Sequence, residues 1–596
     1  MDRRMGVVYG ALTIGALFMG LVLFLAKSAY AGPCESKTAC YVTAGGSGAT
    51  NGVDWNNAYA GLPASLTCGV TYYLAGGSYD YTPISSTISN ACSAGSPLVI
   101  YKAVSGGPGN PQNVAGWESS YGTSQALFSQ QTDSDPEKSH NPFFTLSGTF
   151  ITIDGVVPAS GTPTKNATFG IHLRSANHLS SGFLWVTGAD NTVKHVEFDG
   201  IANPYGFQVT ACSRTGGTVT LTTNGVPHWV AGDKVDLYLN GGKPKDFTTV
   251  PPSTGWPITS ISGSQISYAQ AGPDETCTLP AAPNPATVVL NVHPTGAIFV
   301  NVSANPSNLS LTDNYIHDLA GDIHHGGPGG CNNCTYLRNY FARTHATITE
   351  HVNAIDGAVF NNSVIGQSVF EDIEGGGITN PTCRGTCNWQ NDVIYSNLVF
   401  CTIASRSAYY GQPAGATWQS PQCDTSSIFT DDNGANQVTN LLIYGNTIVR
   451  PLYCNIRLWN PSSTGTITNN FLFCPGATVQ IQGYGARTSY NTGWGAGIDR
   501  ALLGGTQNFW TTHFPDPFVG SSDAAEDFRL ASERVDSGGA TGCKPGNTCL
   551  KDGTALPPPY NTDLAGTPRG AGGTWARGAY DLAPRPPTSL GVQSAH

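Results

Sequence analysis

Two adjacent carboxylates stand out in the segment "SIFTDDNG". Alternate residues of an extended strand share a face, so if Ile428 points into a core, Asp431 points outward and Asp432 lies at a bend. An outward carboxylate on a strand can act as a base or a nucleophile. Asp-Asp-Asn-Gly is equally the composition of an ordinary turn, so a purely structural role is the alternative.

A cation and an aromatic ring alternate with apolar residues in "NIRLW". Ile456 and Leu458 are predicted to face inward, and Arg457 and Trp459 outward. An outward indole ring can stack on a sugar. This segment therefore predicts a cationic and aromatic surface on the same face as the first carboxylate.

Other segments add acids and histidines. In "GIHLRS" the same alternation places His172 and Arg174 outward. His351 and Asp356 lie in "EHVNAID", and Glu374 lies in "FEDIEGGG". Because parallel strands stack about 4.8 Å apart, outward residues of successive strands form a contiguous row that these side chains could join.

Two bond-cleaving chemistries suit these residue types. β-Elimination from a uronate polymer needs a base and a cation that stabilises the enolate, for which we consider Asp431, Arg457, His351 and Asp356. Glycoside hydrolysis needs two carboxylates about 5–10 Å apart, for which Asp431 could act with Asp356 or Glu374. The predicted substrate-binding residues are Trp459, Trp389, Trp418, Arg406 and Arg343. Tryptophans also fill cores, which is the alternative for all three.

Histidines and acids gather in "YIHDLAGDIHHGGPGG". His317, Asp318, Asp322, His324 and His325 offer the ligand atoms that metal ions take in proteins. A solvated glycine-rich bend is the more ordinary explanation of such a stretch. No cofactor is implied with certainty, and Ca²⁺ is the one that lyase chemistry could use.

An asparagine recurs within the pattern apolar-x-x-Asn-x-apolar. It occurs six times, at Asn314, Asn339, Asn362, Asn397, Asn446 and Asn470. Several spacings are near 24 residues, the 49-residue gap suggests two periods, and the 35-residue gap suggests an inserted loop. Such a period with almost no helical signal predicts a solenoid of stacked strands, a right-handed parallel β-helix. The asparagines are expected at tight bends, where each amide bonds the next coil.

The sequence also resembles a known family. "CYVTAGGSGATNGVDWNNAYAGLP" and "YYLAGGSYDY" are similar to the opening, and "EDFRLASERVDSGGA" with "TDLAGTPRGAGGTWARGAYDL" to the close, of bacterial secreted β-helix proteins of the pectin-lyase-like superfamily. The resemblance implies the same all-β fold and leaves the activity open among lyases, hydrolases, epimerases and adhesins. The polygalacturonase motifs are not carried over, because "IHHGG" precedes "TDDNG" and "NIRLW" lacks the lysine.

Five regions are predicted along the chain. They are a signal peptide over 1–31, an N-terminal cap and first coils over 32–206, a small antiparallel β-module inserted over 207–290, the main coils over 291–500, and a C-terminal region over 501–596. The leader has Arg3 and Arg4, an apolar stretch and Ala29-Tyr30-Ala31, although an uncleaved anchor is an alternative. We expect a secreted or cell-surface protein, with the periplasm as the other location.

All sixteen cysteines follow the leader, which favours disulfides. The candidate pairs are Cys34 with Cys40, Cys68 with Cys92, Cys212 with Cys277, and Cys543 with Cys549. The spacing of Cys331, Cys334, Cys383 and Cys387 would also suit zinc, but an oxidising compartment favours disulfides there too.

The net charge of −11 and the absence of a basic run after the leader argue against a nucleic-acid partner. The sequence therefore predicts a monomeric, exported, carbohydrate-active β-helix protein, free of the membrane once its leader is cleaved, that depolymerises an acidic polysaccharide by β-elimination or hydrolysis. The alternative is a non-catalytic glycan-binding protein, adhesin or matrix protein. Convergence of an acid, a base and a cation would favour the enzyme.

Overall fold

The structure is a computed structural model, and it describes twenty-eight stretches of the chain. These are 33–81, 86–130, 142–156, 165, 169–174, 183–200, 206–224, 226–227, 231–238, 255–279, 286–290, 298–300, 307–319, 324–344, 353–373, 375–380, 388–402, 428–430, 437–451, 454–458, 462–483, 486–489, 491–498, 509–511, 518–522, 527–530, 554–569 and 575–579.

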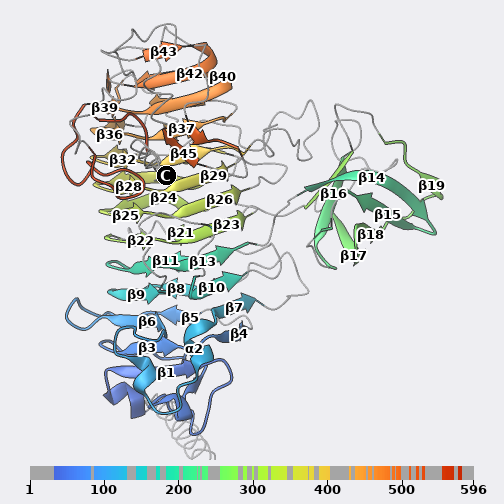
Figure 1. Ribbon diagram of the computed structural model, residues 1–596. Coiled ribbons are helices and arrows are strands. Elements are labelled where there is room, and N and C mark those ends of the chain that lie inside the picture. The colour runs from blue at the N-terminus through green and yellow to red at the C-terminus, as the bar shows by residue number, and fades with distance from the viewer. Residues whose placement is uncertain are drawn as a thin grey trace, which may run out of the picture.

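The chain winds into a right-handed parallel β-helix with three columns of strands, as predicted (Figure 1). Column one is the 13-stranded sheet, in the order β2 (Tyr59–Ala60), β1 (Ala39–Thr43), β3 (Thr71–Leu74), β6 (Leu98–Lys102), β9 (Ile151–Asp154), β12 (Thr192–Lys194), β22 (Ser310–Thr312), β25 (Thr335–Leu337), β28 (Val364–Gly366), β32 (Val393–Tyr395), β36 (Leu441–Tyr444), β39 (Gly465–Thr468) and β41 (Ala486–Ser489).

Columns two and three together form the 23-stranded sheet. Column two runs through β4 (Gly77–Tyr81), β7 (Ala126–Gln130), β10 (Ile171–Arg174), β13 (Val196–Asp199), β23 (Tyr315–Leu319), β26 (Tyr340–Thr344), β29 (Val369–Ile373), β33 (Leu398–Phe400), β37 (Thr447–Val449), β40 (Phe471–Gly483), β42 (Thr492–Ile498) and β43 (Phe509–Thr511).

Column three runs through β5 (Ser86–Ile88), β8 (Phe144–Leu146), β11 (Leu184–Val186), β21 (Ile298–Val300), β24 (His324–Asn332), β27 (Ile355–Asn361), β30 (Ile378–Asn380), β34 (Ile428–Thr430), β38 (Cys454–Leu458) and the end of β40. The C-terminal ends of β24 and β27 pair with each other. The end of β27 also pairs with β31 (Asn388–Gln390), which in turn pairs with β35 (Gln437–Thr439). The N-terminal region adds η1 (Pro33–Ser36), η2 (Trp55–Asn57), η3 (Pro111–Asn113) and α2 (Ser119–Thr123).

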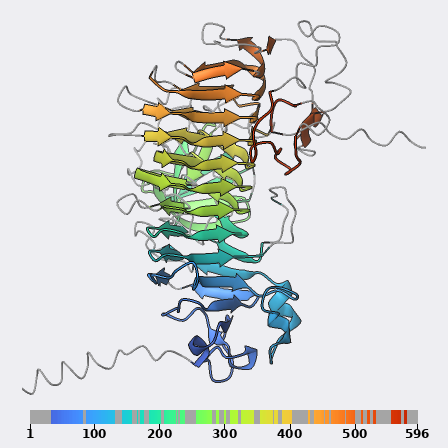
Figure 2. The ribbon, with the colours of Figure 1, turned by 90° about the vertical axis from the view of Figure 1, so that its left-hand side faces the viewer.

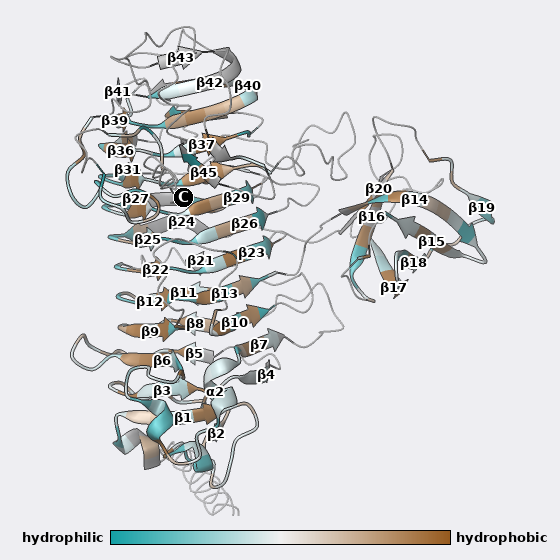
Figure 3. Ribbon diagram, viewed as in Figure 1, coloured by the Kyte–Doolittle hydropathy of each residue, from teal (hydrophilic) through white to brown (hydrophobic). Residues whose placement is uncertain are grey.

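Short strands suit this stack because only alternate residues need to be apolar. In β10, Ile171 and Leu173 are buried, whereas His172 is half-buried and Arg174 is exposed, as the sequence predicted. The inward residues of all three columns form one core cluster that extends from Cys34 to Ile481. Figure 3 shows this pattern as apolar strands with polar residues at many of the bends. A single coil could not bury its apolar side, so each coil depends on its neighbours.

A buried ladder of side chains follows the bend between columns one and two. Asn314, Asn339, Asn397, Asn446 and Asn470 occupy it, as predicted. In each pair the amide oxygen of one asparagine accepts the backbone N–H of the residue one coil earlier, at 2.9–3.1 Å. The ladder stops at Val196, because its N–H donates to Asn314 but its own side chain offers no amide. The ladder continues to Asn491, which the sequence pattern missed.

The prediction that Asn362 belongs to this ladder is wrong. Ser368 fills the place instead, since its hydroxyl accepts the N–H of Asn339 and its own N–H donates to Asn397. Asn362 lies at another bend, exposed and with φ 53°, where its amide oxygen accepts from Asn391. That second bend carries a surface ladder of its own, which continues from Asn391 to Asn440.

The ladder also corrects the predicted coil lengths at three gaps. Asn339 to Ser368 and Ser368 to Asn397 are 29 residues each, so the apparent 23- and 35-residue gaps came from counting Asn362. The 49 residues from Asn397 to Asn446 make one coil rather than two, because β33 pairs directly with β37.

The predicted insertion is an antiparallel sheet that projects to one side of the stack (Figure 1). Its strand order is β15 (Thr218–Thr223), β18 (Gln265–Ala269), β17 (Trp256–Ser262), β16 (Lys234–Tyr238), β20 (Thr287–Leu290), β14 (Gly206–Thr215) and β19 (Glu275–Thr276). It has a separate apolar core. The chain leaves the β-helix after β13 and returns at β21, so the module is attached where column two meets column three.

Five disulfides join described cysteines. The predicted pairs Cys34–Cys40, Cys68–Cys92 and Cys212–Cys277 are present, and Cys331–Cys334 and Cys454–Cys474 join them. The Cys331–Cys334 bond removes two thiolates from the zinc alternative. Cys543 and Cys549 lie outside the described residues. Five disulfides are typical of a protein that matures in an oxidising compartment. Within the described stretches no helix is both long and apolar enough to span a membrane.

The C-terminal region covers part of column two. Outward apolar residues of β29, β33, β37 and β40 (Val369, Leu398, Phe400, Val449, Phe471 and Phe473) form one cluster with β44 (Phe518–Gly520), β45 (Asp527–Leu530), Leu564 and the segment 575–579 (Figure 2). Within this segment, Arg577 donates hydrogen bonds to the carbonyl of Asn491 and the hydroxyl of Thr492, which bond the segment to the β-helix. Column two therefore has an apolar, covered half and, in the coils of β10, β13 and β23, a polar half.

A buried carboxyl makes stability depend on pH. Burial raises the pKa of Asp392 to about 7, although its carboxylate accepts the N–H of Ser363. Its second oxygen has no hydrogen-bond partner among the described residues. Because the folded pKa lies above the unfolded value, the folded state loses stability as pH rises from about 4 through 7.

We therefore expect Asp392→Asn to be more stable than the wild type at pH 8, by about 2–4 kcal/mol on the linkage scale of 1.4 kcal/mol per pKa unit. At pH 4 the difference should vanish. Guanidinium unfolding of both proteins at the two pH values checks this. An equal difference at both pH values would mean that the carboxyl does not titrate between them.

Candidate active site

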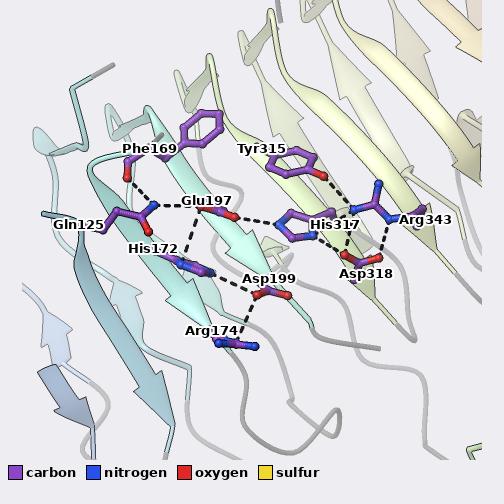
Figure 4. Close-up of polar contacts among 10 residues, drawn as sticks. All are labelled: Gln125, Phe169, His172, Arg174, Glu197, Asp199, Tyr315, His317, Asp318 and Arg343. Carbon is purple, nitrogen blue, oxygen red and sulfur yellow. Dashed lines mark hydrogen bonds and ion pairs between the residues drawn. The ribbon is translucent and has the colours of Figure 1, made fainter. Parts of the chain in front are cut away.

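A cluster of ionisable side chains lies on the polar half of column two (Figure 4). Alternation places His172 on β10, Glu197 and Asp199 on β13, and His317 on β23 on the outward face. Register then sets Asp199 beside His317 and His172 beside Glu197 on neighbouring strands. The cluster occupies the strand ends from which the inserted module departs.

His317 is the centre of the cluster. Its Nδ1 lies 2.6 Å from Asp318 Oδ2, and its Nε2 lies 3.2 Å from Glu197 Oε1. Burial opposes the imidazolium charge, but hydrogen bonds to these two carboxylates outweigh it and raise the pKa of His317 to about 9. The Tyr315 ring stacks on the imidazole at 4.0 Å. His317 is therefore a cation at neutral pH.

A second cation lies one coil further along. Arg343 Nε donates to Asp318 Oδ1 at 2.6 Å, and one terminal nitrogen donates to Asp318 Oδ2 at 2.9 Å and to the Tyr315 hydroxyl at 2.8 Å. Burial alone would raise the pKa of the Asp318 carboxyl, but Arg343 and His317 hold it well below its usual range. Burial raises the pKa of Tyr315 to about 12.

The backbone at this bend is unusual. Asp318, Arg343, Asp372 and Arg450 all have φ between 51° and 61° at the ends of column-two strands. Non-glycine residues in this left-handed region cost energy, and they recur at other bends of the β-helix, for example at Arg338 and Asn362. Here the conformation turns oppositely charged side chains of neighbouring coils toward each other, as in the Asp318–Arg343 pair.

Two further pairs border the centre. His172 Nε2 lies 3.3 Å from Asp199 Oδ2, and Arg174 Nε lies 3.4 Å from the same oxygen. On the other side, Glu371 accepts from the Tyr340 hydroxyl at 2.6 Å and from Lys165 at 2.9 Å. Burial would raise the pKa of Glu197, but its hydrogen bond to His317 and the nearby His172 lower it overall.

The exposed charge of the cluster is positive. Arg174 is 50% exposed and Lys165 26%, whereas Glu197, Asp199 and Asp318 are 13–17% exposed and Glu371 only 5%. The carboxylates therefore act as partly buried counter-ions beneath cations that face solvent. This arrangement suits contact with an anion although the whole chain carries a net charge of −11.

The predicted site residues lie on two faces. Arg343 and Asp318 belong to the cluster. Asp356 and Arg457 lie on column three, where register aligns His325, Asp356, Thr379, Phe429 and Arg457 in one row. Arg457 is outward between buried Ile456 and Leu458, as predicted. Asp356 is almost fully buried and lies 3.4 Å from the side chain of Asn353.

The prediction that Trp389 binds substrate is wrong. It is 1% exposed, packs in the core against Phe360, and donates its indole N–H to the carbonyl of Gly357, so it cannot line a glycan groove. Of the other predicted residues, His324 begins β24. The rest lie outside the described stretches: Asp431, His351, Glu374, Trp459, Trp418, Arg406 and Asp322.

Sequence reasoning missed the acids Glu197, Asp199 and Glu371 and did not assign His172 or His317 to a catalytic centre. A signal was present, because "IHLR", "VEFD" and "YIHD" each place ionisable residues at alternate, outward positions. The 118-residue separation of Asp199 from His317, caused by the insertion, hid their adjacency.

Asp199, His317 and Asp318 bring three metal-ligating atoms within 4.8 Å of one another. Ca²⁺ prefers six to eight oxygen ligands, whereas this set supplies two carboxylates and one imidazole. Both carboxylates already face a guanidinium. The set therefore fits Ca²⁺, the cation that lyase chemistry could use, poorly.

No protein-family model matches the chain, and no curated protein matches it. Solved structures similar to it include pectate lyase Pel9A, at 11% identity and TM-score 0.40 over 92% of this chain and 100% of that one. An alginate lyase from Paenibacillus sp. str. FPU-7 matches at 12% identity and TM-score 0.26, over 75% and 92% of the two chains. A lacto-N-biosidase from Eubacterium ramulus matches at 9% identity and TM-score 0.31, over 79% and 66%. These likenesses concern the fold and leave the chemistry to the residues of this chain.

Proposed function

We propose that this protein is an exported enzyme that binds an acidic polysaccharide at the charged cluster and cleaves it by β-elimination. The observation that carries the proposal is the arrangement of charge: cations face solvent over partly buried carboxylates. A uronate carboxylate would replace solvent at Arg174, and His317 and Arg343 would add positive charge behind it. Charge-assisted hydrogen bonds of this kind are among the stronger polar contacts.

The roles follow from the hydrogen bonds. If His172 donates its Nε2 proton to Asp199, its Nδ1, which lies 3.8 Å from Glu197 Oε2, would accept the proton on the carbon next to the uronate carboxyl group. The electron pair left on that carbon forms a carbon–carbon double bond and expels the glycosidic oxygen. His317, an imidazolium at neutral pH, would give that oxygen the proton of the N–H that it directs at Glu197.

Hydrolysis is less well supported at this cluster. It requires one carboxylic acid that keeps its proton near neutral pH, which needs a raised pKa. The pKa values of Glu197 and Asp318 are both lowered. Of His317, Glu197 and Asp318, the group whose pKa is raised is the imidazole of His317.

One observation favours binding without catalysis. His317 and Arg343 already pair with carboxylates inside the cluster. A network of mutual partners can hold a surface in shape without performing a reaction. Measuring cleavage products and retention on a polyuronate separates the two functions.

The test is to incubate the protein with polygalacturonate, alginate and neutral glycans while absorbance near 235 nm and reducing ends are recorded together. We expect absorbance and reducing ends to rise on one polyuronate. Reducing ends without absorbance would replace elimination by hydrolysis. No product, with retention on one immobilised polyuronate, would favour the binding function.

Arg174→Ala should raise KM for that polymer about tenfold, the effect of losing one charge-assisted hydrogen bond. Lys194→Ala is the matched control, because Lys194 is also partly exposed and pairs with an aspartate, Asp154, on column one. An equal effect of both substitutions would mean that overall charge, and not the cluster, governs binding.

A further inference from the structure

The outward surface of column two is open on one side of the cluster and covered on the other. Register aligns Ser129, Arg174, Asp199, His317 and Ala342 in one row from β7 to β26. Ser129 is half-buried and the Arg174 side chain is 50% exposed, whereas His317 is 6% and Ala342 0% exposed. The row is therefore open toward the N-terminal end of the stack and closed one strand beyond His317.

The neighbouring row of outward residues changes in the same way. It runs through Ser78, Leu127, His172, Glu197, Tyr315 and Tyr340. Ser78 is exposed and Leu127 is half-buried, but Tyr315 and Tyr340 are both buried. Both rows thus lose their access to solvent at β23 and β26.

Phe169 forms a wall at this closed end. Its ring is buried and stacks on Tyr315 with 5.9 Å between ring centres. Its carbonyl accepts a hydrogen bond of 2.7 Å from the side chain of Gln125, and the carbonyl of Gly170 accepts the N–H of Ala126 at 2.8 Å (Figure 4). These bonds hold the backbone of the wall on the β-helix. Further along the stack, the C-terminal region covers column two.

A polysaccharide that follows column two must therefore end at this wall. His172 lies on β10 and His317 on β23, two strands further along, and Ala342 on β26 lies one strand beyond His317. At about 4.8 Å per strand, the closed side leaves room for only about one or two sugar rings beyond the bond that is cleaved. The open side, over β7 and β4, has no such limit among the described residues.

We infer that the enzyme acts on the non-reducing end of its polyuronate and releases short fragments. The inference rests on the proposed function, because it takes His172 as the base and His317 as the acid. The sugar over β10 gives its proton to His172, gains a carbon–carbon double bond and loses its bond to the glycosidic oxygen. That oxygen takes a proton from His317 and becomes the reducing end of the fragment on the closed side. The fragment at the wall is therefore the non-reducing end of the chain.

A polyuronate tagged with a fluorophore at its reducing end tests the length and the direction together. At low conversion, size-exclusion chromatography should show short fragments without the tag and a tagged polymer of almost unchanged length. Fragments of all lengths would mean cleavage inside the chain, and short fragments that carry the tag would mean the opposite direction, so either result would overturn the inference. If no polyuronate gives new absorbance near 235 nm, the proposed elimination fails and the inference fails with it.

Ser78→Asp tests the path of the chain over the open side. The added carboxylate should repel the polyuronate and raise KM for the polymer about threefold, without changing KM for the shortest oligomer that is cleaved. Ser93→Asp is the matched control, because Ser93 is also exposed but lies between β5 and β6, away from column two, and it should leave both values unchanged. Equal KM values for the polymer in the two variants would overturn the path on which the inference depends.

Discussion

Asn446→Ala is expected to lower the free energy of unfolding by about 3–5 kcal/mol, because several buried polar groups lose their partners at once. The Asn446 amide oxygen accepts the backbone N–H and the side-chain N–H of Asn397. Its amide nitrogen donates to the carbonyl of Ile394 and to the side chain of Asn470. Alanine supplies none of these contacts, and the site is too buried for water to replace them.

Asn362→Ala is the matched control, since Asn362 has the same local sequence pattern. It is exposed at the other bend and bonds the side chain of Asn391. Its φ of 53° suits asparagine better than alanine, so a loss of about 1 kcal/mol is expected. Guanidinium unfolding with disulfides intact, followed by circular dichroism, measures both variants. Equal losses would show that burial of the ladder is not what stabilises the bend.

The contrast between Asn446 and Asn362 also shows how far the sequence could predict the fold. A recurring asparagine marks a bend, and this was enough to predict a β-helix. At the buried ladder, however, the left-handed residue is the one before the asparagine, such as Gly445, whereas Asn362 is left-handed itself. Each coil, however, has more than one such bend, and the local pattern is the same for the buried and the exposed ladder. Ser368 performs the buried role with a hydroxyl group, which a search for asparagine cannot find.

The site was harder to predict for a different reason. Alternation correctly oriented Arg457 and His172, because orientation is a local property of a strand. Which outward residues become neighbours depends on register, and register is set by coil lengths that insertions change. The 201–297 excursion separates Glu197 from its partner His317 by 120 residues. Trp389 could have been oriented by the same rule, because an apolar residue between the polar Asn388 and Gln390 is expected to point inward.

Arg343→Lys is expected to lower kcat/KM on the polyuronate substrate about a hundredfold or more, within the range for loss of a group that stabilises developing charge. Lysine keeps the positive charge but cannot hold Asp318 through two parallel hydrogen bonds and reach the Tyr315 hydroxyl as well. Asp318 would then orient the imidazolium of His317 less firmly. Steady-state kinetics followed by absorbance near 235 nm measures the loss.

The chain contains a closely matched control in Arg338→Lys. Arg338 also has a left-handed backbone, and it also holds an aspartate of the preceding coil, Asp313, by two hydrogen bonds of 2.7 Å. It lies at the bend between columns one and two, away from the cluster. Both substitutions should shift the thermal midpoint similarly, but only Arg343→Lys should reduce activity. If the two variants lose activity equally, the arginine fork is a general support of the bends, and the catalytic centre must lie elsewhere on the β-helix.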